Sequence, residues 1–194
     1  MPEGSDLCIT PVSAPENHYV RIKADNRLDA DGTLRGSFTL TAEGQSDSNI
    51  SRIFTTGFRS EWKNTMESQL LAKSPKAKLL SVDYGKNPKD YQAAPIKITF
   101  RYEIPDYALK GEKEMFFRPL VMNNLYNQVR SYLRIDTSLE ERKYGFKDGC
   151  SRLVELDETI QLPAGYKLAN ADKNETMQAT GAHFECSLAP QGNT

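Results

Sequence analysis

The sequence predicts a mainly β fold with one long helix: an antiparallel β-sandwich with an amphipathic helix, at about residues 46–74, packed on one face. Three observations lead to this prediction. Apolar and polar residues alternate over 96–104, which is the period of a strand with one buried face. Asp-Gly pairs at 31–32 and 148–149 are favoured in tight turns between antiparallel strands. Over 46–74, apolar residues instead recur at steps of three and four, which is the period of a helix that buries one face.

Two strands are expected near the start of the chain, at 19–24 and 33–42, where apolar and polar residues alternate. The Asp-Gly pair at 31–32 lies between them, so we expect the two strands to pair antiparallel. Four oxygen-bearing side chains also lie close together here, as in a calcium loop: Asp25, Asn26, Asp29 and Asp31. The calcium pattern fails because it puts Arg27 at the first ligand position and Phe38 at the twelfth, where a glutamate is needed. We therefore expect a turn and no calcium site.

The predicted helix carries one continuous apolar stripe. Its members recur at steps of three or four residues and are Ile50, Ile53, Phe54, Phe58, Trp62, Met66 and Leu70. The polar residues at 46–48 are suited to cap the first turn, and Pro75 marks the end. Such a helix would be roughly 40 Å long, with Gly57 as a place for a bend. Trp62 could also stack on a sugar, but its position in the stripe favours a role in the core.

Most of the remaining chain is expected to form short strands joined by turns. The expected strands span 78–84, 96–104, 114–121, 129–135, 151–162, 166–169 and 183–188. Pro163 and Gly165, in the segment LPAGY, predict a turn after the strand at 151–162. The polar stretch that follows residue 169 is expected to be a loop.

Length, composition and charge limit the domain organisation and the partners. The chain has 194 residues, which is enough for one sizeable core. Residues 1–18 contain three prolines and no apolar period, so we expect an extended linker from a preceding domain, followed by a single β-rich domain at 19–194. The net charge of −1 gives no basic surface to attract nucleic acid. No apolar run reaches the roughly 18 residues of a membrane span, and the first residues do not form a secretion signal.

The chain lacks a recognisable catalytic or metal-binding motif, so we predict no catalytic, cofactor-binding or metal-ligating residue. Its cysteines, Cys8, Cys150 and Cys186, are odd in number and lack the spacing of a zinc site. They are either three thiols or include a Cys150–Cys186 bridge in an oxidising compartment. The histidines are His18 and His183, and His183 lies three residues from Cys186 in an expected strand. An odd spacing puts two strand side chains on opposite faces, so we expect no cysteine nucleophile with a histidine base.

Two weaker patterns have ordinary explanations. Lys73, Lys76 and Lys78 form a basic cluster after the helix, which we interpret as a solvated helix end instead of an anion site. Asn49 and Asn174 match the glycosylation pattern, but a three-residue match has little specificity.

Four motifs occur in an order that resembles a known bacterial arrangement. They are DGTLRGSFTL at 31–40, ITFRYEIPDYAL at 98–109, EERKYGF at 140–146 and IQLPAGYKL at 160–168. Together they resemble the uncharacterised β-rich domain found C-terminal to the transglutaminase-like core in large exported bacterial proteins. The leader, from about residue 2 to 22, resembles the link between that core and the β-rich domain.

This resemblance implies a non-catalytic accessory domain that packs beside or positions a transglutaminase-like core in the same polypeptide. The catalytic cysteine, histidine and aspartate of such proteins belong to the core, and no position of this chain matches them, so the chain itself is not expected to be an enzyme. The resemblance also implies export to the periplasm or the cell surface. The alternative is an independent module that binds a glycan through exposed aromatics such as Tyr126, Tyr132 and Tyr144, or a peptide along an open strand edge.

Overall fold

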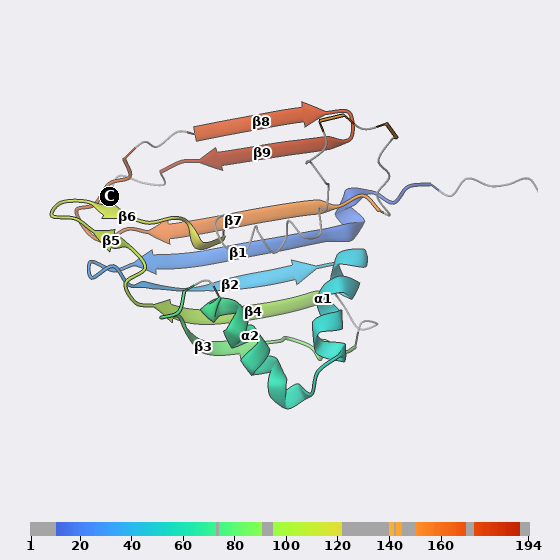
Figure 1. Ribbon diagram of the computed structural model, residues 1–194, viewed down its shortest axis with the longest axis horizontal. Helices are drawn as coiled ribbons and strands as arrows, with labels where there is room; N and C mark the ends of the chain where they lie inside the picture. Colours follow the sequence, from blue (N-terminus) through green and yellow to red (C-terminus); the bar gives the residue numbers. More distant parts are fainter. Residues whose placement is uncertain are drawn as a thin grey trace, which may run out of the picture.

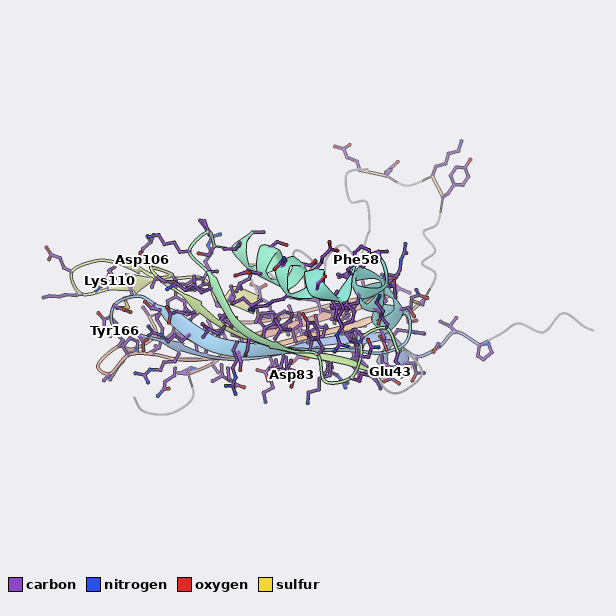
Figure 2. All side chains as sticks on the ribbon, turned by 90° about the horizontal axis from the view of Figure 1, so that it is seen from below. Glu43, Phe58, Asp83, Asp106, Lys110 and Tyr166 are labelled. Atoms are coloured by element: carbon purple, nitrogen blue, oxygen red, sulfur yellow. The ribbon has the colours of Figure 1, made fainter. Side chains whose placement is uncertain are left out.

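The structure, a computed structural model, describes residues 11–72, 74–90, 95–121, 140–141, 143–144, 150–169 and 173–190. Its centre is a five-stranded sheet in the order β3-β4-β2-β1-β7 (Figure 1). The strands are β1 (Tyr19–Leu28), β2 (Leu34–Ala42), β3 (Lys78–Asp83), β4 (Ile96–Ile104) and β7 (Leu153–Gln161). The helices α1 (Gln45–Thr55) and α2 (Trp62–Leu71) lie on one face of the sheet (Figure 2). The prediction of a mainly β fold is confirmed.

The strands of the sheet are mostly antiparallel. β1 pairs with β2, β2 with β4 and β3 with β4, all antiparallel, so the expected hairpin of β1 and β2 is confirmed. β7 instead pairs with β1 in parallel, from Tyr19 opposite Leu153 to Arg27 opposite Gln161. Parallel neighbours need a long connection, which the chain between β1 and β7 provides. A period of two residues identifies a strand but not its direction, so the sequence did not reveal this parallel pairing.

The buried face of the sheet is built from every second residue of its central strands. These residues are Val20, Ile22, Ala24, Asn26 and Leu28 in β1, and Ile96, Ile98, Phe100, Tyr102 and Ile104 in β4. Ile50 and Phe54 of α1 pack into the same core, together with Trp62, Met66 and Leu70 of α2. Full burial of one large apolar side chain contributes about 1.5–3 kcal/mol. The core shared by the sheet and the helices is therefore the main source of stability.

The single long helix predicted at 46–74 is wrong, because the structure divides this segment into two helices. The hydroxyl of Thr55, the last residue of α1, donates to the carbonyl oxygen of Arg52 at 3.0 Å. Such side-chain bonds compete with helical backbone pairing. Phe58 then has an extended backbone, with φ −72° and ψ 147°. Its amide donates to the Glu61 carboxylate at 3.2 Å, which begins the turn that leads into α2.

The break between the helices exposes part of the predicted apolar stripe. Ile53 is 43% exposed and Phe58 is 77% exposed. Figure 2 shows Phe58 on the helix side of the molecule. Gly57, the expected place for a bend, lies within the break.

The predicted sandwich is not supported, since no second sheet packs face to face on the main sheet among the described residues. The face away from the helices carries exposed charged side chains at its centre, such as Lys23 in β1 and Arg101 in β4. Burying such charges under another sheet would carry a large desolvation cost. The alternation of apolar and polar residues that suggested a sandwich also occurs in an antiparallel sheet with one face exposed to water.

The other described strands form two hairpins, β5 (Leu109–Lys110) with β6 (Met115–Phe116) and β8 (Lys173–Ala179) with β9 (Ala182–Leu188). The strand expected at 114–121 is reduced to β6, and 166–169 is not a strand. The expected strand at 183–188 is confirmed as β9. Its partner β8 was expected to be a loop, because its residues are mostly polar. The strand expected at 129–135 and the Asp-Gly pair at 148–149 lie outside the described residues.

The turn between β1 and β2 forms as predicted. Gly32 has a positive φ of 89°, and the amide of Asp29 donates to the carbonyl oxygen of Thr33 at 2.9 Å. The Asp31 carboxylate accepts the amide of Thr33 at 2.9 Å, and the Asp29 carboxylate pairs with Arg35. These aspartates therefore stabilise the turn and its flanking strands.

Candidate functional site

The cysteines in the described part of the chain are free thiols. Cys150 and Cys186 are both half-buried, and Cys8 lies outside the described residues. The alternative of a Cys150–Cys186 bridge is therefore wrong. Strand-rich surroundings suggested the bridge, but the two residues do not lie on paired strands. Cys186 lies in β9 opposite Glu175, whereas Cys150 lies in the irregular segment before β7.

His183 and Cys186 occupy positions on opposite faces of β9, as their odd spacing predicts. His183 lies opposite Gln178 of β8, and its Nδ1 is 2.6 Å from the side-chain oxygen of Gln178. Its Nε2 is 3.8 Å from a carboxylate oxygen of Glu185. These contacts hold the ring within its own hairpin, on the face away from Cys186.

His18 fixes the start of α1 to the leader of the chain. A short helical turn, η1 (Pro15–His18), brings it against α1, where its Nδ1 accepts the backbone amide of Gln45 at 3.1 Å. The hydroxyl of Ser46 donates to the His18 carbonyl oxygen at 2.9 Å. Gly44 permits this approach, since an added Cβ would lie 2.4 Å from His18 Nδ1. The role of His18 is therefore structural: it satisfies an amide that the first helical turn leaves unpaired.

Trp62 is a core residue, as its position in the helical stripe predicts. It is only 4% exposed, and its ring lies edge-on to Phe54 and Tyr84, with centroid distances of 5.2 and 5.5 Å. Arg59 and Lys89 approach the same ring, with their charged groups 5.9 and 5.8 Å from its centroid. A ring covered in this way presents no face to a sugar, so the stacking alternative is wrong for Trp62.

Among the tyrosines that could stack on a glycan, the structure describes Tyr144. It is 77% exposed, and the Lys143 ammonium lies 5.7 Å from its ring centroid. Tyr126 and Tyr132 lie outside the described residues.

The lysines after the helices take part in surface ion pairs. Lys76 pairs with Asp106, and Lys78 pairs with Glu103 at 3.3 Å. Lys73 lies outside the described residues. Both described lysines are exposed, which agrees with the interpretation of a solvated helix end.

A chain of hydrogen bonds crosses the buried face of the sheet. The Tyr102 hydroxyl in β4 donates to the side-chain oxygen of Asn26 in β1 at 2.5 Å, and the Asn26 amide donates to the Glu158 carboxylate in β7 at 2.7 Å. That carboxylate also accepts the backbone amides of Leu120 and Val121, at 3.0 and 2.8 Å. The network therefore ties three strands that are distant in sequence to the segment at 120–121.

Gly36 of β2 leaves the space for this network. It lies opposite Asn26 on one side and opposite Tyr102 on the other. A Cβ at this position would lie 2.0 Å from Asn26 Oδ1, the atom that accepts the Tyr102 hydroxyl. A residue with a side chain would therefore displace Asn26, and only glycine leaves room for the contact between Asn26 and Tyr102. Burial raises the pKa of Tyr102 above its ordinary value, which keeps the hydroxyl protonated as a donor. The Glu158 carboxylate is held by donors from Asn26, Leu120 and Val121, so we assign the network a structural role.

The sequence contains a signal for this network. Asn26 takes an apolar position in the alternation of β1, and Glu158 takes one in the alternation of β7. A polar residue at a buried strand position needs a hydrogen-bond partner. Asn26 was instead grouped with the neighbouring aspartates as part of a turn.

One face of the β8–β9 hairpin carries a group of apolar side chains, beside Glu175 of β8, that the described residues leave open. Met177 lies opposite Phe184, and Cys186 and Leu188 follow on the same face of β9. Met177 is 68% exposed, and Phe184 and Leu188 are each 40% exposed. We call these four residues the hairpin patch. An isolated two-stranded hairpin is marginally stable in water, so such a face is expected to find a partner.

Comparison with known proteins identifies no relative: the chain matches no protein-family model, no curated protein and no solved structure. Among the described helices, none has the length and apolar content that a membrane crossing needs. Nor does the described part of the chain contain a group of three or more His, Cys, Asp or Glu side chains that could hold a metal ion. The functional proposal therefore depends on the hairpin patch and on the resemblance in the sequence motifs.

Proposed function

We propose that this chain is a non-catalytic accessory domain that packs beside, or positions, the core of a transglutaminase-like protein. The observation that carries the proposal is the hairpin patch, an apolar surface that the described residues leave open. Surfaces of this kind mark sites of contact with other proteins. The four motifs that resemble the β-rich domain of exported transglutaminase-like proteins point to the core of the same polypeptide as the partner.

The contacts of the described histidines support a non-catalytic role. A cysteine nucleophile needs a base in contact with its thiol. His18 accepts a backbone amide at the start of α1, and His183 is held by Gln178 on the face of β9 away from Cys186. Both rings thus serve local structure.

The resemblance also supports a place in the periplasm or at the cell surface. There, an independent glycan-binding module is the second candidate function. The exposed ring of Tyr144 favours this candidate, since an aromatic face open to water can stack on a sugar.

The sequence immediately upstream of Met1 in the native gene tests the proposal. We expect it to encode a transglutaminase-like core. If another kind of sequence precedes Met1, the accessory role is overturned and the independent binding module becomes the better assignment, because there would be no core for this chain to position.

A further inference from the structure

β7 is an edge strand of the main sheet. It pairs with β1 on one side, and no strand in the described part of the chain pairs with its other side. Figure 1 shows the β8–β9 hairpin beyond that free side, with β9 running alongside β7, and Figure 2 shows the strands in one layer. The hairpin nevertheless forms a separate two-stranded sheet. Within the described part of the chain, two strands that each lack a partner strand on one side therefore lie near one another.

The outer edge of β7 lacks three of the features by which edge strands avoid further pairing: short length, a proline and an irregular register. Its nine residues keep an unbroken register with β1 and include no proline. The opposite edge strand, β3, has only six residues, and its pairing with β4 shifts register between Leu79 and Ser81. Short length and register irregularity protect an edge. β7 is thus the edge of this sheet that is open to an additional strand.

Apolar side chains on β7 and β9 fit a strand that is apolar at every second position. Val154, Leu156 and Ile160 of β7 are partly buried against the core. Phe184 and Leu188 of β9 are each 40% exposed. Neighbouring residues on one face of a sheet contact each other, so an added strand with alternate apolar side chains would contact the apolar residues of β7 and β9 that lie on the same face as those side chains.

Some of the polar positions of the same two strands carry acidic side chains. Glu155 and Asp157 are exposed on β7, and Glu185 is exposed on β9. Glu155 pairs with Arg21. Opposite charges on neighbouring strands are stabilising and like charges are destabilising. An added strand with basic polar positions is therefore favoured, whereas a second copy of β7 would bring its own carboxylates.

We propose that the free edges of β7 and β9 bind an extended segment of a partner polypeptide in which apolar residues alternate with lysine or arginine. Main-chain hydrogen bonds to the two edges provide the affinity, and the alternation provides the specificity. The inference goes beyond the accessory role, because it specifies the bound segment and does not require that the partner be a transglutaminase-like core.

A synthetic peptide tests this inference with the full 194-residue chain. The peptide has the length of β7, nine residues, and alternates valine with lysine. We expect it to form a one-to-one complex and to slow amide hydrogen exchange in both β7 and β9. The same peptide with glutamate in place of lysine should bind at least about tenfold more weakly. A peptide with proline at its central position should not bind, because proline cannot complete the main-chain pairing.

Two variants of the chain locate the binding site. Asp157→Lys should weaken binding of the lysine peptide about two- to fivefold. Asp83→Lys makes the same charge change on the exposed face of the other edge strand and should leave binding unchanged. Circular dichroism confirms that both variants fold. Equal binding of the lysine and glutamate peptides, or no effect of Asp157→Lys, would overturn the inference. So would a free chain in which β7 edge amides are already protected, either by β9 or by a second copy in a dimer detected by light scattering.

Discussion

At the scale of single residues, Asn26 joins the buried hydroxyl of Tyr102 to the carboxylate of Glu158. Asn26→Ala leaves that hydroxyl without its acceptor and removes one donor from Glu158. We expect the free energy of unfolding to fall by about 1–3 kcal/mol, measured by urea denaturation. Asp25→Ala, at the adjacent exposed position, is the control and should change stability by less than about 0.5 kcal/mol. Similar losses in the two variants would show that the network does not stabilise the fold.

Gly36 tests the same network by steric exclusion. Gly36→Ala places a Cβ 2.0 Å from Asn26 Oδ1, so the network must shift. We expect a loss of about 1–3 kcal/mol in thermal unfolding experiments. Gly111→Ala is the matched control, since its Cβ would lie 3.5 Å from the Glu114 carbonyl oxygen, an ordinary contact. If both positions accept alanine equally well, the close approach of Asn26 to Gly36 is contradicted.

Asp31 makes the turn between β1 and β2 sensitive to pH. Hydrogen bonds from the backbone amide and the side chain of Thr33 hold the pKa of Asp31 below its ordinary value. Because the pKa of Asp31 is lower in the folded chain than in the unfolded chain, the ionised carboxylate stabilises the fold. This contribution is complete above the unfolded pKa and is lost as the pH falls through the folded pKa. NMR titration of the Asp31 carboxyl measures this pKa. Asp31→Asn keeps an acceptor oxygen and should abolish this part of the pH dependence, and an ordinary pKa for Asp31 would contradict the account.

At the scale of elements, the strand period was more reliable than the helix period. The strands β1, β2, β4 and β7 alternate because each buries one face, and the sequence predicted all four. The helix break was missed because Phe54, Phe58 and Trp62 keep a step of four residues across it, although Phe58 is exposed. β8 was not predicted because most of its residues are polar, so apolar and polar residues do not alternate clearly along it.

Trp62 anchors α2 to the core, so its removal should loosen that helix. Trp62→Ala removes a ring that contacts both Phe54 of α1 and Tyr84. We expect a loss of about 3–5 kcal/mol in the free energy of unfolding, measured by chemical denaturation. Phe58→Ala, which removes a 77% exposed ring from the break between the helices, should cost much less. Equal costs would place Trp62 outside the core.

At the scale of the whole molecule, the way in which distant strands come together could not be predicted from local patterns. The buried network joins β1, β4 and β7, and only the folded sheet brings these strands together. The apolar residues of β9 were visible in the sequence, but whether other elements cover them depends on where the hairpin lies. No described strand pairs with the other edge of β7, beside that hairpin. The parallel pairing of β7 with β1 could not be predicted either, because a period of two residues carries no information about strand direction.

Binding between this chain and the transglutaminase-like core expected in the same gene, with the two produced separately, tests the central claim most directly. Isothermal titration calorimetry should detect a complex with the unmodified chain. The double variant Met177→Asp, Phe184→Asp should bind at least about tenfold more weakly, because it places charges in the hairpin patch. Leu80→Asp, at a 58% exposed apolar position on β3, should bind like the unmodified chain. Equal binding by all three proteins, or no binding by the unmodified chain, would contradict the account.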